Sequence, residues 1–158
     1  MRRGGFSLIE TLIGTALMLV VFVSIFGVFN MGIKIVGKSK AKAGAIALAT
    51  ERMELIRNLP YKDVGTAGGL VPGNIPQTES IVLNGINYTR SVFVQYVDDP
   101  KDGIGANDEN GVTADYKIAR VEVNWPGAAS PVIFVSNIIP KGIETVAGGG
   151  TLKLNVFD

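Results

Sequence analysis

The sequence predicts an α+β fold, in which one long N-terminal α-helix is followed by an antiparallel β-sheet. Two observations support this class. The first is an apolar segment that continues into an amphipathic helical pattern and ends before Pro60. The second is a series of β-prone segments separated by turn residues, which begins near position 80 and includes Asn84-Gly85. The 158 residues allow one domain with a smaller appendage.

The first half of the predicted helix has the composition of a membrane span. Thr11–Ile33 contains 23 residues and no charged side chain. As an α-helix it would be about 35 Å long, enough to cross a hydrocarbon core of about 30 Å. A cleaved secretory signal is the alternative, since Arg2 and Arg3 precede the segment. The segment is longer than the apolar part of such a signal, and Glu10 lies at its start, so we interpret it as a retained membrane helix.

The helical pattern continues beyond the apolar segment. Apolar residues recur there at steps of three and four, which predicts one buried helix face: Ile46, Ala49, Met53 and Ile56. The charged residues of the same stretch are interpreted as a solvated face: Glu51, Arg52, Glu54 and Arg57. Pro60 disfavours helical geometry in the residue before it. The helix is therefore predicted over residues 6–58, with its second half lying across a sheet.

Residues 59–79 are interpreted as a linker and residues 80–158 as an antiparallel sheet domain. Strands are predicted at 80–83, 86–97, 116–125 and 132–139. Asn84-Gly85 is a strong hairpin signal, because both turn residues must accept positive φ. In the third strand every second residue from Ala119 to Trp125 is apolar, which predicts one buried and one half-solvated face. An alternating segment at 152–157 is predicted as a short strand that joins this sheet or pairs with another copy of the chain.

The composition excludes several classes of active site. The chain contains no histidine and no cysteine, which removes His- and Cys-dependent nucleophiles, zinc–thiolate sites and disulfides. Fifteen basic and 14 acidic residues give a net charge of +1, without the basic bias of a nucleic-acid-binding domain. No nucleophile–base pairing is visible. We expect neither an enzyme nor a direct nucleic-acid site.

Glu10 is the carboxylate at the border of the apolar segment. A carboxylate inside a membrane costs a few kcal/mol at the centre and less near the edge, so it is usually paired or functional. A glutamate in the first turn of a helix is also favoured by the helix dipole alone. The position of Glu10 by itself leaves both interpretations open.

The residues around Glu10 resemble a known processing site. The segment reads Gly4-Gly5-Phe6-Ser7-Leu8-Ile9-Glu10-Thr11-Leu12 and follows a basic pair. It is similar to the N-terminal motif of type IV pilins and type II secretion pseudopilins, in which a basic leader ends in Gly, Phe follows, and Glu lies four residues beyond. The resemblance implies that residues 1–5 are a leader. It also implies that a prepilin peptidase cuts between Gly5 and Phe6 and methylates the new amino terminus.

The same resemblance implies a pilin-like fold and an assembly role for Phe6 and Glu10. In a filament the apolar helices bundle into a core, where an unpaired carboxylate is unfavourable. The α-amino group of Phe6 from a neighbouring subunit would neutralise Glu10 there. The implied partners are the membrane before assembly, the prepilin peptidase, an assembly platform and further copies of the chain.

The orientation of the span is a point on which charge and resemblance disagree. Four lysines follow the span: Lys34, Lys38, Lys40 and Lys42. A positive-inside count would place this side in the cytoplasm. The family pattern places it outside, with the precursor in the cytoplasmic membrane and the assembled filament extracellular, and we follow the family.

Residues 98–115 form an acidic loop between the second and third predicted strands. Its candidate ligands for a hard cation are Asp98, Asp99, Asp102, Asp108, Asn110 and Asp115. Ca²⁺ takes six to eight oxygen ligands, and the glycines of the loop allow tight turns. The same residue types also make ordinary solvated turns, and the closing Glu of an EF-hand is missing. In composition the loop resembles the calcium-binding loop of major pseudopilins, so Ca²⁺ is the one cofactor that the sequence suggests.

The function expected from the sequence is that of a structural subunit of a type IV pilus or pseudopilus filament. The alternative is a membrane-anchored extracellular binding module that does not polymerise. Cleavage after Gly5 with methylation of Phe6 would favour the first, and an uncleaved leader the second.

Overall fold

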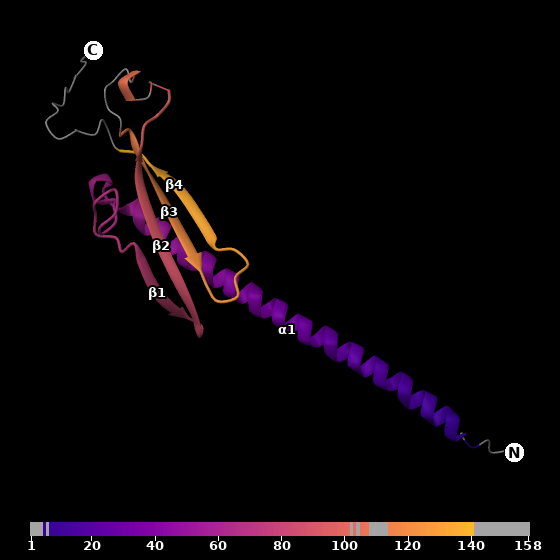
Figure 1. Cartoon of the computed structure of the whole chain (residues 1–158). Helices are drawn as coiled ribbons and strands as arrows, with labels where there is room; N and C mark the ends of the chain where they lie inside the picture. Colours follow the sequence, from indigo (N-terminus) through magenta and orange to yellow (C-terminus); the bar gives the residue numbers. More distant parts are fainter. Residues whose placement is uncertain (1–4, 6, 102, 104, 108–113, 141–158) are drawn as a thin grey trace, which may run out of the picture. The chain divides into compact units, whose positions relative to one another are not determined.

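The structure, a computed structural model, describes residues 5, 7–101, 103, 105–107 and 114–140, so the strand predicted at 152–157 lies outside it. The described chain begins with one long helix, α1 (Leu8–Asn58), and continues into a sheet (Figure 1). The later elements are η1 (Tyr61–Asp63), β1 (Thr78–Leu83), β2 (Ile86–Val97), η2 (Gly105–Asn107), β3 (Tyr116–Asn124) and β4 (Val132–Ile138). The predicted α+β class is confirmed.

The chain divides into two units, residues 1–41 and 42–158. In the described part of the first unit, α1 is continuous from Leu8 and passes through Gly14, Gly27 and Gly32 without a break. Its large apolar residues from Leu8 to Val36 are all more than half exposed, from 53% at Ile35 to 83% at Leu8. The first unit therefore has no core of its own among these residues.

The sheet of the second unit is an antiparallel meander with the strand order β1-β2-β3-β4. The hairpin between β1 and β2 pairs Leu83 with Ile86 across a two-residue turn. Asn84 and Gly85 in this turn have φ values of 52° and 78°. Positive φ at both positions is the geometry that the Asn-Gly dipeptide predicts.

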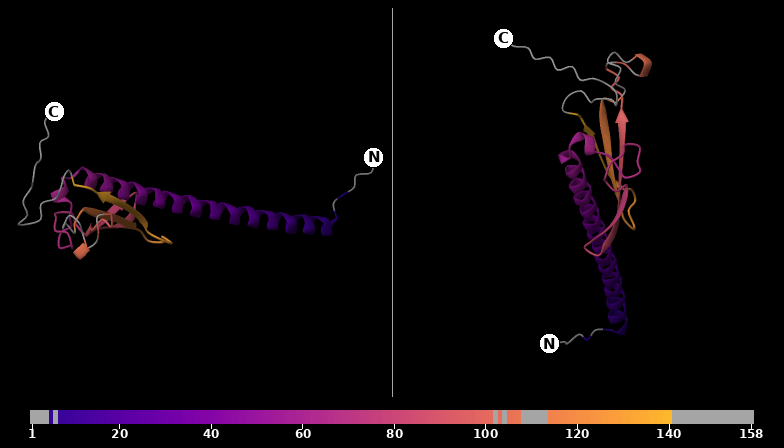
Figure 2. Two further views of the ribbon diagram at one scale, coloured as in Figure 1. Left: turned by 90° about the horizontal axis from the view of Figure 1, so that it is seen from above. Right: turned by 90° about the vertical axis from the view of Figure 1, so that its left-hand side faces the viewer.

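Residues 42–58 of α1 lie against one face of the sheet (Figure 2). The helix contributes the following buried residues to the core: Ala45, Leu48, Ala49, Met53 and Ile56. The sheet contributes side chains that alternate along its strands, chiefly Tyr88, Val92, Val94, Ala119, Val121, Val123 and Ile138. Trp125 packs against this cluster, so the buried face predicted for the third strand is confirmed.

One residue of the predicted helix face is misplaced. Ile46 is 40% exposed, whereas Ala45 is fully buried. Successive helical residues point about 100° apart, so a face centred on Ala45, Ala49 and Ile56 leaves Ile46 at its edge. The small side chains of Ala45 and Ala49 form the part of the helix that faces the sheet.

The segment 59–79, which the sequence suggests is a linker, contributes to the core. Val64, Val71 and Ile75 in it are buried. Its turns pack closely: a Cβ atom added to Gly65 would lie 2.2 Å from the carbonyl oxygen of Pro72. The first strand also begins at Thr78, two residues before the predicted start. The segment is therefore part of the folded second unit.

Candidate functional site

The predicted processing site lies at the start of α1. Gly5 is exposed and precedes the helix, while Phe6 lies outside the described residues. The Ser7 hydroxyl accepts a hydrogen bond from the Glu10 backbone N–H at 3.3 Å, and the Ser7 carbonyl accepts one from the same group at 3.1 Å. Ser7 and Glu10 thus have the spacing of a capping box, a helix-start signal that the sequence interpretation did not use.

Glu10 itself is exposed in the first turn of α1. No ion pair of the described residues involves it. The large apolar side chains that follow it on α1 are exposed as far as Val36. By length and composition α1 is able to cross a membrane, so the first unit is compatible with a membrane anchor.

The structure describes three of the six candidate ligands of the acidic loop: Asp98, Asp99 and Asp115. The Asp98 and Asp115 carboxylates accept hydrogen bonds from the N–H groups of Gly105 and Asp99, at 2.9 and 2.6 Å. Asp99 accepts one from the N–H of Lys101 at 3.2 Å. These bonds order the chain just after β2 and just before β3. Three further candidates lie outside the described residues: Asp102, Asp108 and Asn110.

Within the described part of the loop, one buried atom has no hydrogen-bond partner. The Asp98 Oδ1 atom is buried and accepts no hydrogen bond from the described residues. A carboxylate oxygen in this state fits a role as a cation ligand, because burial without a partner is unfavourable. Within the described residues, however, no group of three acidic side chains is arranged to hold a metal ion. The described part of the loop therefore presents one buried carboxylate oxygen without a hydrogen bond and no complete set of metal ligands.

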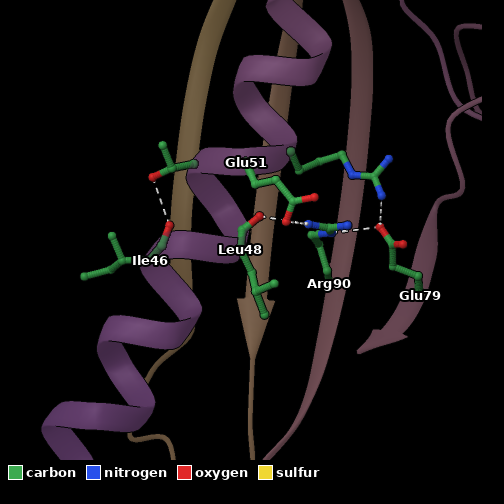
Figure 3. Close-up of polar contacts among 7 residues, drawn as sticks. Ile46, Leu48, Glu51, Glu79 and Arg90 are labelled. Carbon is green, nitrogen blue, oxygen red and sulfur yellow. Dashed lines mark hydrogen bonds and ion pairs between the residues drawn. The ribbon is translucent and has the colours of Figure 1, made fainter. Parts of the chain in front are cut away.

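A buried arginine joins α1 to the sheet, and the sequence interpretation did not identify it. Arg90 on β2 is 4% exposed. Its guanidinium donates to the Leu48 carbonyl oxygen at 2.9 Å and to Glu79 on β1 at 2.8 Å, and lies 3.4 Å from Glu51 (Figure 3). The period-two pattern of β2 places Arg90 between Tyr88 and Val92 on the core face, and this was the available signal.

Glu79 is shared by two arginines. Arg52 on α1 donates to the same carboxylate oxygen that accepts from Arg90. Burial alone would raise the pKa of Glu79, but the hydrogen bond and positive charge of Arg90, together with Arg52, hold this pKa below its ordinary value of 4.5. The prediction that Arg52 belongs to a solvated face is wrong, because its side chain is only 12% exposed and bridges α1 to β1.

Lys117 on β3 is the second buried cation that sequence interpretation missed. Its ammonium group donates to the carbonyl oxygens of Tyr61 and Val64, at 2.8 and 3.0 Å. It also lies 4.3 Å from the centre of the Tyr61 ring and 5.3 Å from that of Tyr96. Lys117 thereby attaches the turn after α1 to the sheet.

The face of the sheet that bears no helix carries a shallow hollow of about 390 Å³. It is lined by Gln77, Thr78, Ser91, Val92, Phe93, Arg120 and Glu122. Phe93 is 46% exposed there, and Arg120 donates to Glu122 at 2.8 Å. The hollow therefore combines an aromatic ring with a neutralised charge pair and several hydrogen-bonding side chains.

Comparison of the chain with family models, with curated proteins and with solved structures finds no match. The assignment of a function therefore depends on the residues and geometry described above.

Proposed function

We propose that the chain is a structural subunit of a type IV pilus or pseudopilus filament, anchored in the membrane by the first half of α1 before it assembles. The observation that carries this proposal is the apolar surface of α1 from Leu8 to Val36, where every large apolar side chain is more than half exposed. A helix that is apolar on all sides is stable only inside a membrane or inside a bundle of other helices. A filament subunit uses both environments in turn.

The start of α1 supports the same proposal. Ser7 caps the helix at the Glu10 N–H, which fixes the position of Glu10 in the first turn. Residues 4–12 resemble a prepilin processing site, and cleavage there would create an α-amino group on Phe6. This group is the proposed partner of the Glu10 carboxylate. In the proposed filament this group pairs with Glu10 of a neighbouring subunit and sets the axial position of each incoming subunit.

Single-cysteine labelling of filaments sheared from cells tests the proposal. The chain has no cysteine, so one introduced residue reports without background. Val23→Cys, at a position 72% exposed in the single chain, should resist a water-soluble maleimide in lipid-free filaments. Ser80→Cys, on an exposed position of β1, should react and serves as the matched control. Equal labelling of both positions, or absence of the chain from the sheared material, would contradict the filament proposal.

A second candidate function is that of an anchored binding module, and the hollow beside Phe93 favours it. An exposed aromatic ring beside hydrogen-bonding side chains is typical of a small-ligand or partner site. In this case the chain would stay in the membrane fraction with its leader uncleaved. The sheared fraction described above separates the two functions, because a module that does not polymerise is missing from it.

Calcium binding by residues 98–115 is a separate proposal that is compatible with either function. The Asp98 Oδ1 atom, buried and without a hydrogen bond from the described residues, supports it. The ion would complete its ligands with oxygens supplied by Asp102, Asp108 and Asn110. Bound Ca²⁺ would connect the ends of β2 and β3 in a chain that has no disulfides.

A further inference from the structure

We infer that Lys34, Lys38 and Lys40, here called the juxtamembrane lysines, bind the head groups of anionic lipids while α1 spans the membrane. The inference rests on the membrane anchorage in the proposed function and does not depend on polymerisation. It names the class of lipid that holds the subunit before assembly.

The juxtamembrane lysines follow the apolar segment directly. All three are exposed and helical, and they begin at the residue after Ile33. Lys34 and Lys38 are four residues apart and therefore lie on the same side of α1. Lys40 points to a different side of the helix. Together they present positive charge around more than one side of α1 immediately after the span.

Their depth matches that of lipid head groups. A bilayer has an apolar core of about 30 Å and a total thickness of about 40–45 Å, so each head-group layer is about 5–8 Å thick. With a rise of 1.5 Å per residue, a span that leaves the core at Ile33 puts Lys34 and Lys38 in this layer. Lys40 lies slightly higher, and its long side chain can extend toward the phosphates.

Their charges have no carboxylate partner on the helix. Between Glu10 and Glu51 the sequence contains no acidic residue. None of the ion pairs found in the described part of the chain involves a juxtamembrane lysine. Uncompensated basic residues next to a span attract anionic lipids. Carboxylates of a second copy are a less direct partner, because nothing on α1 at this depth supplies them.

The test measures which lipid surrounds the inserted full-length chain. The chain, with Arg2 and Arg3 replaced by Gln in every sample, is placed in phosphatidylcholine vesicles that contain traces of spin-labelled phosphatidylglycerol or phosphatidylcholine. The motionally restricted fraction of each label gives the relative association of the two lipids. We expect a preference of about fivefold for phosphatidylglycerol, the ratio that one lysine near an anionic surface supplies. High salt should weaken this preference.

The triple variant Lys34→Gln/Lys38→Gln/Lys40→Gln should associate equally with both lipids. Lys62→Gln, at an exposed lysine in η1, is the matched control and should keep the preference. Equal association of both lipids with the unaltered juxtamembrane lysines, or a preference that survives in the triple variant, would overturn the inference. Flotation of the vesicles after an alkaline wash reports insertion separately. Failure to insert would contradict the proposed anchorage itself and this inference with it.

Discussion

Arg90 illustrates how a single charged residue is accommodated in the core of the second unit. Its side chain is 4% exposed and is surrounded by the Leu48 carbonyl oxygen and two carboxylates. A buried charge is stable only when its partners remain in place, because an uncompensated one retains the full desolvation penalty. The partners come from α1 and β1, so Arg90 ties both elements to β2.

Arg90→Ala is expected to lower the free energy of unfolding by about 2–3 kcal/mol, since it leaves a cavity and removes the partner of a partly buried carboxylate. Trp125 is the only tryptophan and packs against the core, so its fluorescence can follow denaturant unfolding of the full chain in detergent. Arg120→Ala, which breaks an exposed pair with Glu122, should change stability by less than about 1 kcal/mol. Equal effects of the two variants would contradict the role of Arg90.

Glu79 should make stability depend on pH in the acid range. Its pKa in the folded chain is depressed by Arg90 and Arg52, so the carboxylate stabilises the fold at pH above its ordinary value of 4.5. This stabilisation is lost as the pH falls through the lower folded pKa. The slope of unfolding free energy against pH below 4.5 should be smaller in Glu79→Gln than in the unaltered chain. Identical slopes would mean that Glu79 is not coupled to folding.

For single residues, the sequence predicted a structural role correctly where that role depends only on neighbouring residues in the chain. Asn84 and Gly85 form the predicted turn, because both φ values depend on these two residues alone. The prediction of a solvated Arg52 was wrong, because the environment of this side chain depends on which residue of β1 lies opposite the helix. Arg90 and Lys117 were missed, since a charged residue in a strand reads as solvent-facing unless the partners that neutralise it are known.

Among the elements, α1 is a single helix whose two parts differ in character. Residues 8–36 expose apolar side chains on every side, whereas residues 42–58 bury one stripe against the sheet. The existence and the end of α1 were predictable, because Pro60 and the apolar periodicity are strong local signals. The buried stripe was predicted with one residue misplaced, because small alanines gave a weaker signal than Ile46.

Glu10→Ala is expected to leave the precursor inserted and cleavable but to reduce its incorporation into filaments. The physical reason is the loss of the proposed pair with the amino group of a neighbouring Phe6. Filament yield measured against the amount of processed subunit in the membrane checks this expectation. Ser7→Ala is a useful comparison, since it removes the cap seen at the Glu10 N–H but keeps the carboxylate. Normal filament yield from Glu10→Ala would remove Glu10 from the assembly mechanism.

The loop between β2 and β3 shows where prediction from the sequence stops at the element scale. The type of ligand was predictable from the dense set of Asp and Asn side chains. The arrangement of these side chains was not predictable, because Asp99 and Asp115 also accept hydrogen bonds from backbone N–H groups of the same loop. Three of the candidate ligands also lie outside the described residues, so the calcium site stays a prediction.

Calcium should raise the melting temperature of the full chain if the loop binds it. Binding to the folded state alone contributes about 2.7 kcal/mol when calcium is a hundredfold above its dissociation constant. The melting temperature, followed by Trp125 fluorescence, should therefore be lower in a chelator. Magnesium should restore it poorly. Asp98→Ala, Asp102→Ala or Asp108→Ala should abolish the difference, whereas Glu109→Ala should keep it. Identical melting with calcium and with chelator would identify the loop as a solvated turn.

In the whole molecule, the two units differ in how their apolar surface is buried. The second unit buries an apolar core of its own between residues 42–58 and a four-stranded sheet. The first unit leaves its apolar surface uncovered in the single chain, so it needs lipid or other copies of the helix. The α+β class was predictable, because the first unit contains a long uncharged apolar run and the second unit follows helical and alternating patterns. A single chain does not show what covers the first unit, and therefore the function is a proposal.

We propose that a processed chain assembles through α1, and the N-terminal peptide of isolated filaments is the decisive measurement. No lysine or arginine lies between Phe6 and Lys34, so trypsin should release Phe6–Lys34 as one peptide. We predict that mass spectrometry of sheared filaments finds this peptide with one added methyl group on its amino terminus. A peptide that retains Gly5 or earlier residues, or an unmethylated Phe6 in abundant filaments, would contradict processing and assembly through α1.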